Sequence, residues 1–188
     1  MAQARTLRER ELKQLLQNMQ YRRHALRNRV MLLCTHWAGM RVGEVAALRY
    51  GDVIGADGTI NAEIRLSAEQ TKGDRARVVY IPEKLRRELL NYVRTFPRSH
   101  GAIPLFYTQK RVGWTANTLT QHFHWLYKRA GLAGASSHSG RRTFITTLAN
   151  KGVGIRVLQA LAGHRDLRTT AVYIEANDAL KRAAVELV

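Results

Sequence analysis

The chain has 188 residues, of which 45% are hydrophobic and 24% are charged. That length suits one domain with a single core, and that balance excludes an intrinsically disordered chain. Lysine and arginine outnumber aspartate and glutamate by 31 to 14, which gives a formal net charge of +17. A compact chain with such an excess repels itself and favours an anionic partner, most often nucleic acid. The charge alone fits a basic structural or ribosomal protein equally well.

Cysteine usage and hydropathy indicate the setting. The single cysteine, Cys34, stands in the apolar run 30–34. It forms no internal disulfide and no cysteine-rich zinc site, and it is predicted to be buried and inert. No apolar stretch approaches the length of a membrane span, and no signal peptide is expected. We therefore expect a protein of a reducing, cytoplasmic setting without contact to a membrane.

Helical periodicity dominates the first fifty residues. Thr6 and Glu9 have the spacing of a capping box, which predicts the start of a helix. Gly39 is expected to separate the second helix from the third. The predicted helices cover residues 6–19, about 24–37 and about 41–48.

Residues 57–82 have a different pattern. Apolar and polar residues alternate from Ile60 to Leu66, which is the periodicity of a strand. Residues 71–74 form a turn signal, and residues 78–81 are predicted to return as a second strand. The stretch predicts a small antiparallel sheet inside a helical protein.

The C-terminal half returns to helical spacing after a loop-like stretch at 96–114. Gly131 and Gly152 stand where C-terminal helix caps belong. The predicted helices cover residues 85–93, 115–130, 141–150, 155–162 and 178–188. The sequence therefore predicts a mainly α fold with a small antiparallel β-sheet (α+β), as one domain over residues 1–188.

Four short stretches carry side chains suited to chemistry. In chain order they supply Arg41 with Glu44 beside it, Lys72, His138, Arg141, His164 and Tyr173. Taken alone, each has a plainer explanation as a solvated charge, a helix cap or a core residue. No carboxylate pair or metal cluster stands among them, so no metal or other cofactor is expected.

This set of side chains suits attack on a phosphodiester. A planar guanidinium binds the non-bridging oxygens through two parallel hydrogen bonds and stays charged, so Arg41 and Arg141 are candidates to hold the phosphate. A free tyrosine has a pKa of about 10, so Tyr173 needs a base or a positive potential to become a nucleophile. Lys72, at a turn, is a candidate general acid for the departing sugar oxygen.

In combination these stretches resemble the tyrosine recombinase, or phage integrase, family. The family has an arginine with a nearby acidic residue after a glycine turn, a lysine in a β-turn, and a His-x-x-Arg motif often followed by Arg-Thr-Phe. It ends with Gly-His, then Thr-Thr, and a tyrosine nine residues after that histidine. The matching positions are Arg41 and Glu44, Lys72, His138 and Arg141 with residues 142–144, and His164 with Thr169, Thr170 and Tyr173.

The resemblance implies an activity and partners. Tyr173 is expected to attack DNA and form a 3′-phosphotyrosine, while Lys72 protonates the 5′ oxygen and His138 acts as general base or phosphate donor. Arg41, Arg141 and His164 would hold the phosphate, and Glu44 would support the site. The expected partner is double-stranded DNA, bound by a homotetramer, with a C-terminal tail at residues 178–188 that packs on a neighbouring subunit. For the DNA-free protein two alternatives stay open: a monomer, and a tail that folds back on its own core.

The sequence departs from the family pattern in packing positions and in length. Gly140 and Ala162 stand where leucine is common. The chain also has no room for the N-terminal helical domain of most members, so it is a short form or a fragment. Two alternatives stay open: a type IB topoisomerase, which relaxes DNA without a partner duplex, and a DNA-binding module without catalysis. The spacing from Gly-His to Tyr173 favours the recombinase.

Overall fold

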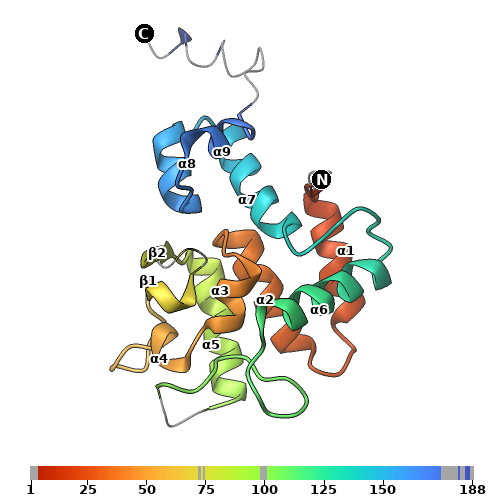
Figure 1. Cartoon of the computed structure of the whole chain (residues 1–188). Coiled ribbons are helices and arrows are strands. Elements are labelled where there is room, and N and C mark those ends of the chain that lie inside the picture. The colour runs from red at the N-terminus through yellow and green to blue at the C-terminus, as the bar shows by residue number, and fades with distance from the viewer. Residues whose placement is uncertain are drawn as a thin grey trace.

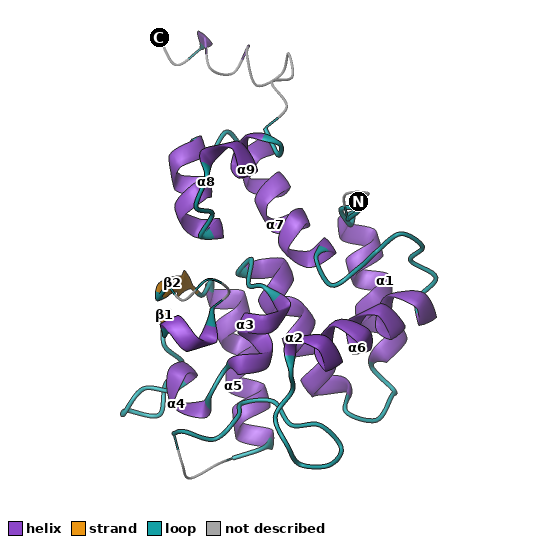
Figure 2. Cartoon of the chain, viewed as in Figure 1, coloured by secondary structure: helices purple, strands orange, loops and turns teal. Residues whose placement is uncertain are grey.

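The computed structural model describes residues 4–71, 73, 75–97, 101–174, 182, 185 and 186. Within these residues most of the chain is helical, and one two-stranded sheet lies at the side of the molecule (Figures 1 and 2). The elements are α1 (Glu9–Met19), α2 (Ala25–Trp37), α3 (Val42–Ala47), α4 (Tyr50–Val53), β1 (Glu63–Leu66), the 3₁₀ helix η1 (Ala68–Gln70), β2 (Arg77–Tyr80), α5 (Glu83–Thr95), α6 (Ala116–Arg129), α7 (Ser139–Asn150), α8 (Ile155–Ala162) and α9 (Leu167–Ala171). The predicted mainly α fold with a small antiparallel sheet is confirmed.

Helix α2 is the centre of the fold. Its residues Val30, Met31, Leu32 and Leu33 follow one another and are all fully buried. An apolar stretch buried on every side belongs to a helix that is covered all round. Helices α1, α3, α5 and α7 pack against α2. Cys34 is buried there as predicted, and desolvation raises the pKa of its thiol to about 12.

The sheet pairs β1 with β2 in antiparallel register, with Glu63 opposite Tyr80 and Leu66 opposite Arg77. Ile64, Leu66 and Val79 are buried, as expected when alternate residues face the core. Strand β1 is shorter than the predicted segment 60–66, because Ile60 forms only an isolated bridge with Ile54. Strand β2 begins and ends one residue before the predicted segment 78–81. The sheet also positions Arg77, the first residue of β2, whose side chain reaches α3 and the end of α8.

The start of α1 corrects a prediction. Thr6 and Glu9 form no capping box; the helix begins at Glu9, and the carboxylate of Glu11 accepts the backbone N–H of Arg8 at 2.8 Å. Leu7 is buried, and its N–H donates to Thr143 Oγ1 of α7 at 2.9 Å. This tertiary contact keeps the segment before α1 extended along α7, where it cannot join the helix.

Helices α7, α8 and α9 form the C-terminal part of the described chain, drawn at the top of Figure 1. Four buried apolar residues of α7 and α8 lie outside the main core cluster: Ile145, Ala149, Leu158 and Ala162. Gly140 is the point where α7 approaches α2, since a Cβ at this position would overlap the side chains of Thr35 and His36. The glycine that replaces the family's usual leucine therefore allows close contact between these helices.

The helix ends agree with the glycine pattern, whereas two short helices were not predicted. Gly131 and Gly152 have φ values of +72° and +80°, which confirms them as C-terminal caps. Helices α4 and α9, of four and five residues, have no counterpart in the predicted set. The predicted helix at 178–188 falls for the most part outside the described residues. No helix of the described chain has the length and apolar character needed to cross a bilayer.

Candidate active site

Five of the side chains selected from the sequence line one cleft. The cleft has a volume of about 470 Å³, and these five are Arg41, His138, Arg141, His164 and Tyr173. They come from the starts of α3 and α7, from the first turn of α7, and from the segments that follow α8 and α9. Positions that are 132 residues apart in the chain therefore meet at one surface, as 173 − 41 = 132.

Glu44 lies beneath the cleft and binds two arginines. Its side chain is 1% exposed. Arg41 donates to it from Nη1 at 2.8 Å and from its backbone N–H at 2.7 Å, and Arg77 donates from Nε at 2.9 Å and Nη2 at 2.8 Å. Burial alone would raise the pKa of Glu44, but the hydrogen bonds and charges of Arg77 and Arg41 outweigh it and hold the pKa below its usual value.

Three arginines bind three consecutive carbonyls at the end of α8. The pairs are Arg77 Nη1 with Leu161 O at 2.9 Å, Arg141 Nη2 with Ala162 O, and Arg41 Nη2 with Gly163 O at 2.9 Å. The last carbonyls of a helix have no partner within it and carry partial negative charge, which suits cationic donors. The end of α8 is thereby fixed to β2, α7 and α3 at once.

Gly39, two residues before Arg41, contacts the helix that carries Arg141. Its φ is +63°, and a Cβ there would overlap the ring of Phe144. Its carbonyl accepts Arg141 Nη1 at 2.7 Å. Burial, followed by repulsion from Arg41, lowers the pKa of Arg141, but an arginine starts so high that the guanidinium stays charged at neutral pH. The Arg141 side chain is therefore held in one orientation before any ligand arrives.

His164 is neutral at physiological pH. Burial and then the charges of Arg141, Arg41 and Arg77 lower its pKa to about 4. Its Nδ1 lies 2.9 Å from Oγ1 of Thr170, a fully buried residue of α9. When the threonine hydroxyl donates to Nδ1, Nε2 carries the proton and is a donor for an anion.

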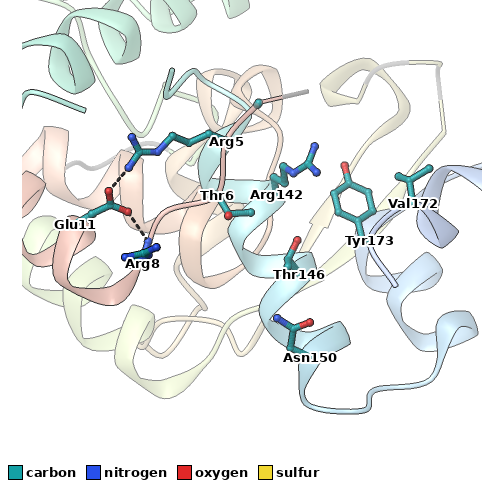
Figure 3. A pocket seen from close by; sticks show the side chains of 10 residues that line it. Arg5, Thr6, Arg8, Glu11, Arg142, Thr146, Asn150, Val172 and Tyr173 are labelled. Carbon is teal, nitrogen blue, oxygen red and sulfur yellow. Dashed lines mark hydrogen bonds and ion pairs between the residues drawn. The ribbon is translucent and has the colours of Figure 1, made fainter. Parts of the chain in front are cut away.

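Tyr173 follows α9, and its ring contacts two other side chains of the site. Its ring stacks on His164, with centroids 6.1 Å apart and an interplanar angle of 19°. The guanidinium carbon of Arg142 lies 5.4 Å from the centre of the Tyr173 ring. Figure 3 shows Arg142 beside the phenol, on the side of a second and larger cleft.

Lys72 lies outside the described residues. Its neighbours in the chain, Thr71 and Gly73, line a cavity of about 180 Å³ together with Arg41 and His164. The turn between β1 and β2 therefore borders the same site.

Two arginines of this arrangement were assigned no role from the sequence. Arg77 had one signal: it is two residues before Val79, so strand periodicity puts it on the face that is buried. A charged residue on a buried strand face needs a partner, but nothing in the sequence identifies Glu44 as that partner. Arg142 stands next to a motif arginine, and only the fold shows that it reaches Tyr173.

The chain belongs to the phage integrase family, because the model of that family matches residues 5–179. Among curated relatives, the tyrosine recombinase XerA of Pyrococcus furiosus is 28% identical over 185 residues, which cover 97% of this chain and 61% of that protein. A crystal structure of XerA recombinase superposes with a TM-score of 0.76 at 25% identity, over 100% of this chain and 66% of that one. The XerH recombinase bound to its difH substrate, before cleavage, superposes with a TM-score of 0.68 at 26% identity, over 95% of this chain and 53% of that one. The chain thus spans under two thirds of the length of these relatives.

Proposed function

We propose that the chain is a site-specific recombinase that cleaves and rejoins double-stranded DNA through a covalent bond to Tyr173. The observation that carries this proposal is the convergence of Arg41, Arg141, His164 and Tyr173 on one cleft. Its relatives support it, since they are named tyrosine recombinases and XerH was captured on a DNA substrate. The net charge of +17 supports a polyanionic partner.

In the proposed reaction the phosphate is bound by groups already in position. An arginine has five N–H donors, and Arg41 and Arg141 each use two guanidinium nitrogens on the protein, which leaves donors for phosphate oxygens. Neutral His164 adds a donor through Nε2. Donors fixed before the reaction stabilise the charge that develops on the phosphorane without reorganising.

The covalent step exchanges one ester for another. The Tyr173 oxygen bonds to phosphorus, the bond from phosphorus to the 5′ oxygen breaks, Lys72 supplies the proton to that oxygen, and His138 accepts the phenol proton. The 3′-phosphotyrosine keeps the ester energy, so a second 5′ hydroxyl reverses the step without ATP. The groups lining the described part of the cleft are arginine, histidine, tyrosine and threonine, with no carboxylate to bind Mg²⁺.

The proposal includes an assembly of four copies on two duplexes. Its support is the sequence of the tail, in which the spacing of Leu180, Ala184, Leu187 and Val188 predicts an apolar face on a helix. A short amphipathic helix is marginal alone in water and needs a surface to cover that face. In the proposed complex, residues 178–188 of one copy pack on the next.

The test is covalent trapping on DNA. The chain is incubated, with excess EDTA, with a library of nicked duplexes of varied sequence, and adducts that resist denaturant are isolated and sequenced. We expect an adduct for the parent chain, none for Tyr173→Phe, and an unchanged yield for Tyr21→Phe, whose side chain is 93% exposed and does not line the cleft.

Four results would contradict the proposal. An adduct from Tyr173→Phe places the nucleophile elsewhere, and a yield that needs Mg²⁺ rejects the metal-free mechanism. Failure to trap any adduct leaves a DNA-binding module. Relaxation of a supercoiled plasmid without paired sites would instead indicate a type IB topoisomerase.

A further inference from the structure

A second cleft adjoins the candidate active site and shares Tyr173 with it. It has a volume of about 730 Å³, within the range of ligand sites. We call it the Arg142 cleft; its lining residues include Arg5, Thr6, Arg8, Arg142, Thr146 and Asn150 (Figure 3). Ala4, Arg142 and Tyr173 line both this cleft and the first one. A strand that leaves the candidate active site past Tyr173 would therefore enter the Arg142 cleft.

The Arg142 cleft carries positive charge that the described residues do not neutralise. Arg5 is paired with Glu11. Within residues 4–71, 73, 75–97 and 101–174, the side chains of Arg8 and Arg142 form no ion pair with any carboxylate. Glu11 also lines the cleft, but its ion pair is with Arg5, and Arg8 lowers its pKa first through a backbone hydrogen bond and least through its charge. The guanidinium donors of Arg8 and Arg142 therefore suit an anion with several acceptor oxygens.

Neutral donors stand beside these arginines. In the same part of the chain, Thr6, Thr146 and Asn150 line the cleft with side-chain groups that hydrogen bond to no other described residue. Hydroxyl and amide groups are common partners of DNA phosphates, together with arginine. The cleft thus offers both the charge and the hydrogen bonds that a phosphodiester requires.

The wall formed by the chain's N-terminal segment is held in place by the fold. Leu7 N–H donates to Thr143 Oγ1 at 2.9 Å, and Arg5 Nη1 donates to the carbonyl of Ala133 at 2.9 Å. The opposite wall is α7, which carries Arg142 and Thr146. Fixed walls lower the entropy lost when a ligand is bound.

We propose that Arg8 and Arg142 of the Arg142 cleft bind a DNA phosphodiester. It is the one that neighbours, on the same strand, the phosphodiester that Tyr173 attacks. This inference rests on the proposed function, because it takes the ligand of the first cleft to be DNA. Arg142 contacts both the Tyr173 ring and the bound phosphate, so a strand in this cleft also fixes the position of the tyrosine. Arg142 is in this sense a positioning residue for the nucleophile.

The experiment compares Arg8→Ala and Arg142→Ala with Arg10→Ala in the full chain. Arg10 is exposed two residues from Arg8 and does not line the cleft, so its variant removes the same charge at a neighbouring place. Affinity for a duplex selected by covalent trapping is measured over a range of salt. We expect the slope of log K against log salt to fall by about 0.9 for each of the two cleft variants, the value for one lost phosphate contact, and to stay unchanged for Arg10→Ala. Arg142→Lys keeps a point charge and should keep the slope.

A chemical probe identifies the phosphate. Neutral methylphosphonates are placed one at a time along the cleaved strand. Next to the scissile position, one of them should weaken binding and slow adduct formation by the parent chain. The further loss should be smaller in Arg142→Ala, which keeps the Arg8 contact, and absent when Arg8→Ala and Arg142→Ala are combined.

The outcomes separate this inference from the function it rests on. If the parent chain forms no adduct, both the proposed function and the proposed phosphate site in the Arg142 cleft are rejected. If the adduct forms but the salt slopes and methylphosphonate profiles of both cleft variants equal those of Arg10→Ala, the second phosphate site alone is wrong. If those profiles are unchanged and only recombination of paired sites is lost, the cleft binds a protein segment of another copy, which also overturns the proposal.

Discussion

Arg77 connects three elements of the site with one side chain. Its guanidinium forms a two-pronged pair with Glu44 of α3 and donates to Leu161 O at the end of α8, while its own backbone belongs to β2. The side chains of Arg77 and Glu44 are 10% and 1% exposed, so water can replace little of either interaction. Because Glu44 also orients Arg41, the effect of Arg77 extends to an arginine that lines the cleft.

Arg77→Ala is therefore expected to lower both stability and activity. Breaking a buried, hydrogen-bonded ion pair costs up to about 3–5 kcal/mol of unfolding free energy when the remaining charge is left unpaired, and the cost is lower here because Arg41 still pairs with Glu44. Arg77→Lys should recover only part of it, because an ammonium group lacks the planar fork. Urea unfolding and the rate of adduct formation measure the two effects. The control is Arg65→Ala on the exposed side of β1; a variant of Arg77 as stable as this control would show that the pair is not structural.

Among single residues, the sequence predicted side chains that line the cleft but not the arginine, Arg77, that pairs with Glu44 beneath them. The residue types and spacings selected five side chains that the structure brings to one cleft. The role of Arg77 was not predicted, because its partner Glu44 stands 33 positions earlier in the chain (77 − 44 = 33). No local rule connects a strand residue to a helix carboxylate at that distance. Long-range pairs of this kind depend on the tertiary fold.

The contact between α2 and α7 leaves no room for a side chain at Gly140. Gly140 precedes Arg141, and any side chain on Gly140 would meet Thr35 and His36 of α2. The position of α7 against α2 therefore sets the position of Arg141 in the cleft.

Gly140→Ala should destabilise the protein although alanine is the better helix former. The helical preference of alanine over glycine contributes about 1 kcal/mol, whereas overpacking a core contact costs typically about 1–3 kcal/mol and moves the neighbouring backbone. We expect a net loss of stability of up to about 2 kcal/mol and a slower cleavage step. The matched control is Gly154→Ala, where a Cβ meets nothing within 4 Å. Equal melting temperatures for the two variants would refute the close packing at Gly140.

Element boundaries were predictable where a helix had several turns of clear periodicity. Helices α4 and α9 have four and five residues, too few to repeat an apolar face, so no periodic signal existed for them. Thr6 and Glu9 have the residue types and spacing of a capping box, but the box does not form, because the hydrogen bond of Leu7 to α7 holds this segment outside the helix. Local patterns fail at such points because a tertiary interaction is stronger than one cap.

For the whole molecule, four histidines with depressed pKa values link stability to pH: burial lowers the pKa of His24, and that of three others falls further. Burial lowers the pKa of His36, His122 and His164 to about 4, with nearby arginine charges adding to the effect for the last two. In the unfolded chain these groups titrate near 6.5. Between these two values the unfolded state binds more protons than the folded state, so stability increases with pH across that window.

The expected result is a fall in unfolding free energy as the pH drops from 6.5 to 5, above the range in which carboxylates titrate. Urea unfolding at several pH values measures it. His36→Gln removes one of these groups, at a position where Nε2 of the histidine meets the Tyr127 hydroxyl at 3.2 Å, and should make the dependence on pH shallower. Stability that does not change over this interval would be inconsistent with neutral buried histidines.

The three arginines that bind the carbonyls at the end of α8 also constrain the number of residues in that helix. Each residue added to an α-helix rotates the C-terminal remainder of that helix by about 100° and advances it by about 1.5 Å. An insertion or deletion inside Ile155–Ala162 would point the carbonyls of residues 161–163 away from their three donors and rotate His164 out of the cleft. Related sequences should accordingly vary in residue identity on the exposed face of α8 while keeping its residue count. Changes in length should occur instead in turns such as 55–59, whose hydrogen bonds are local.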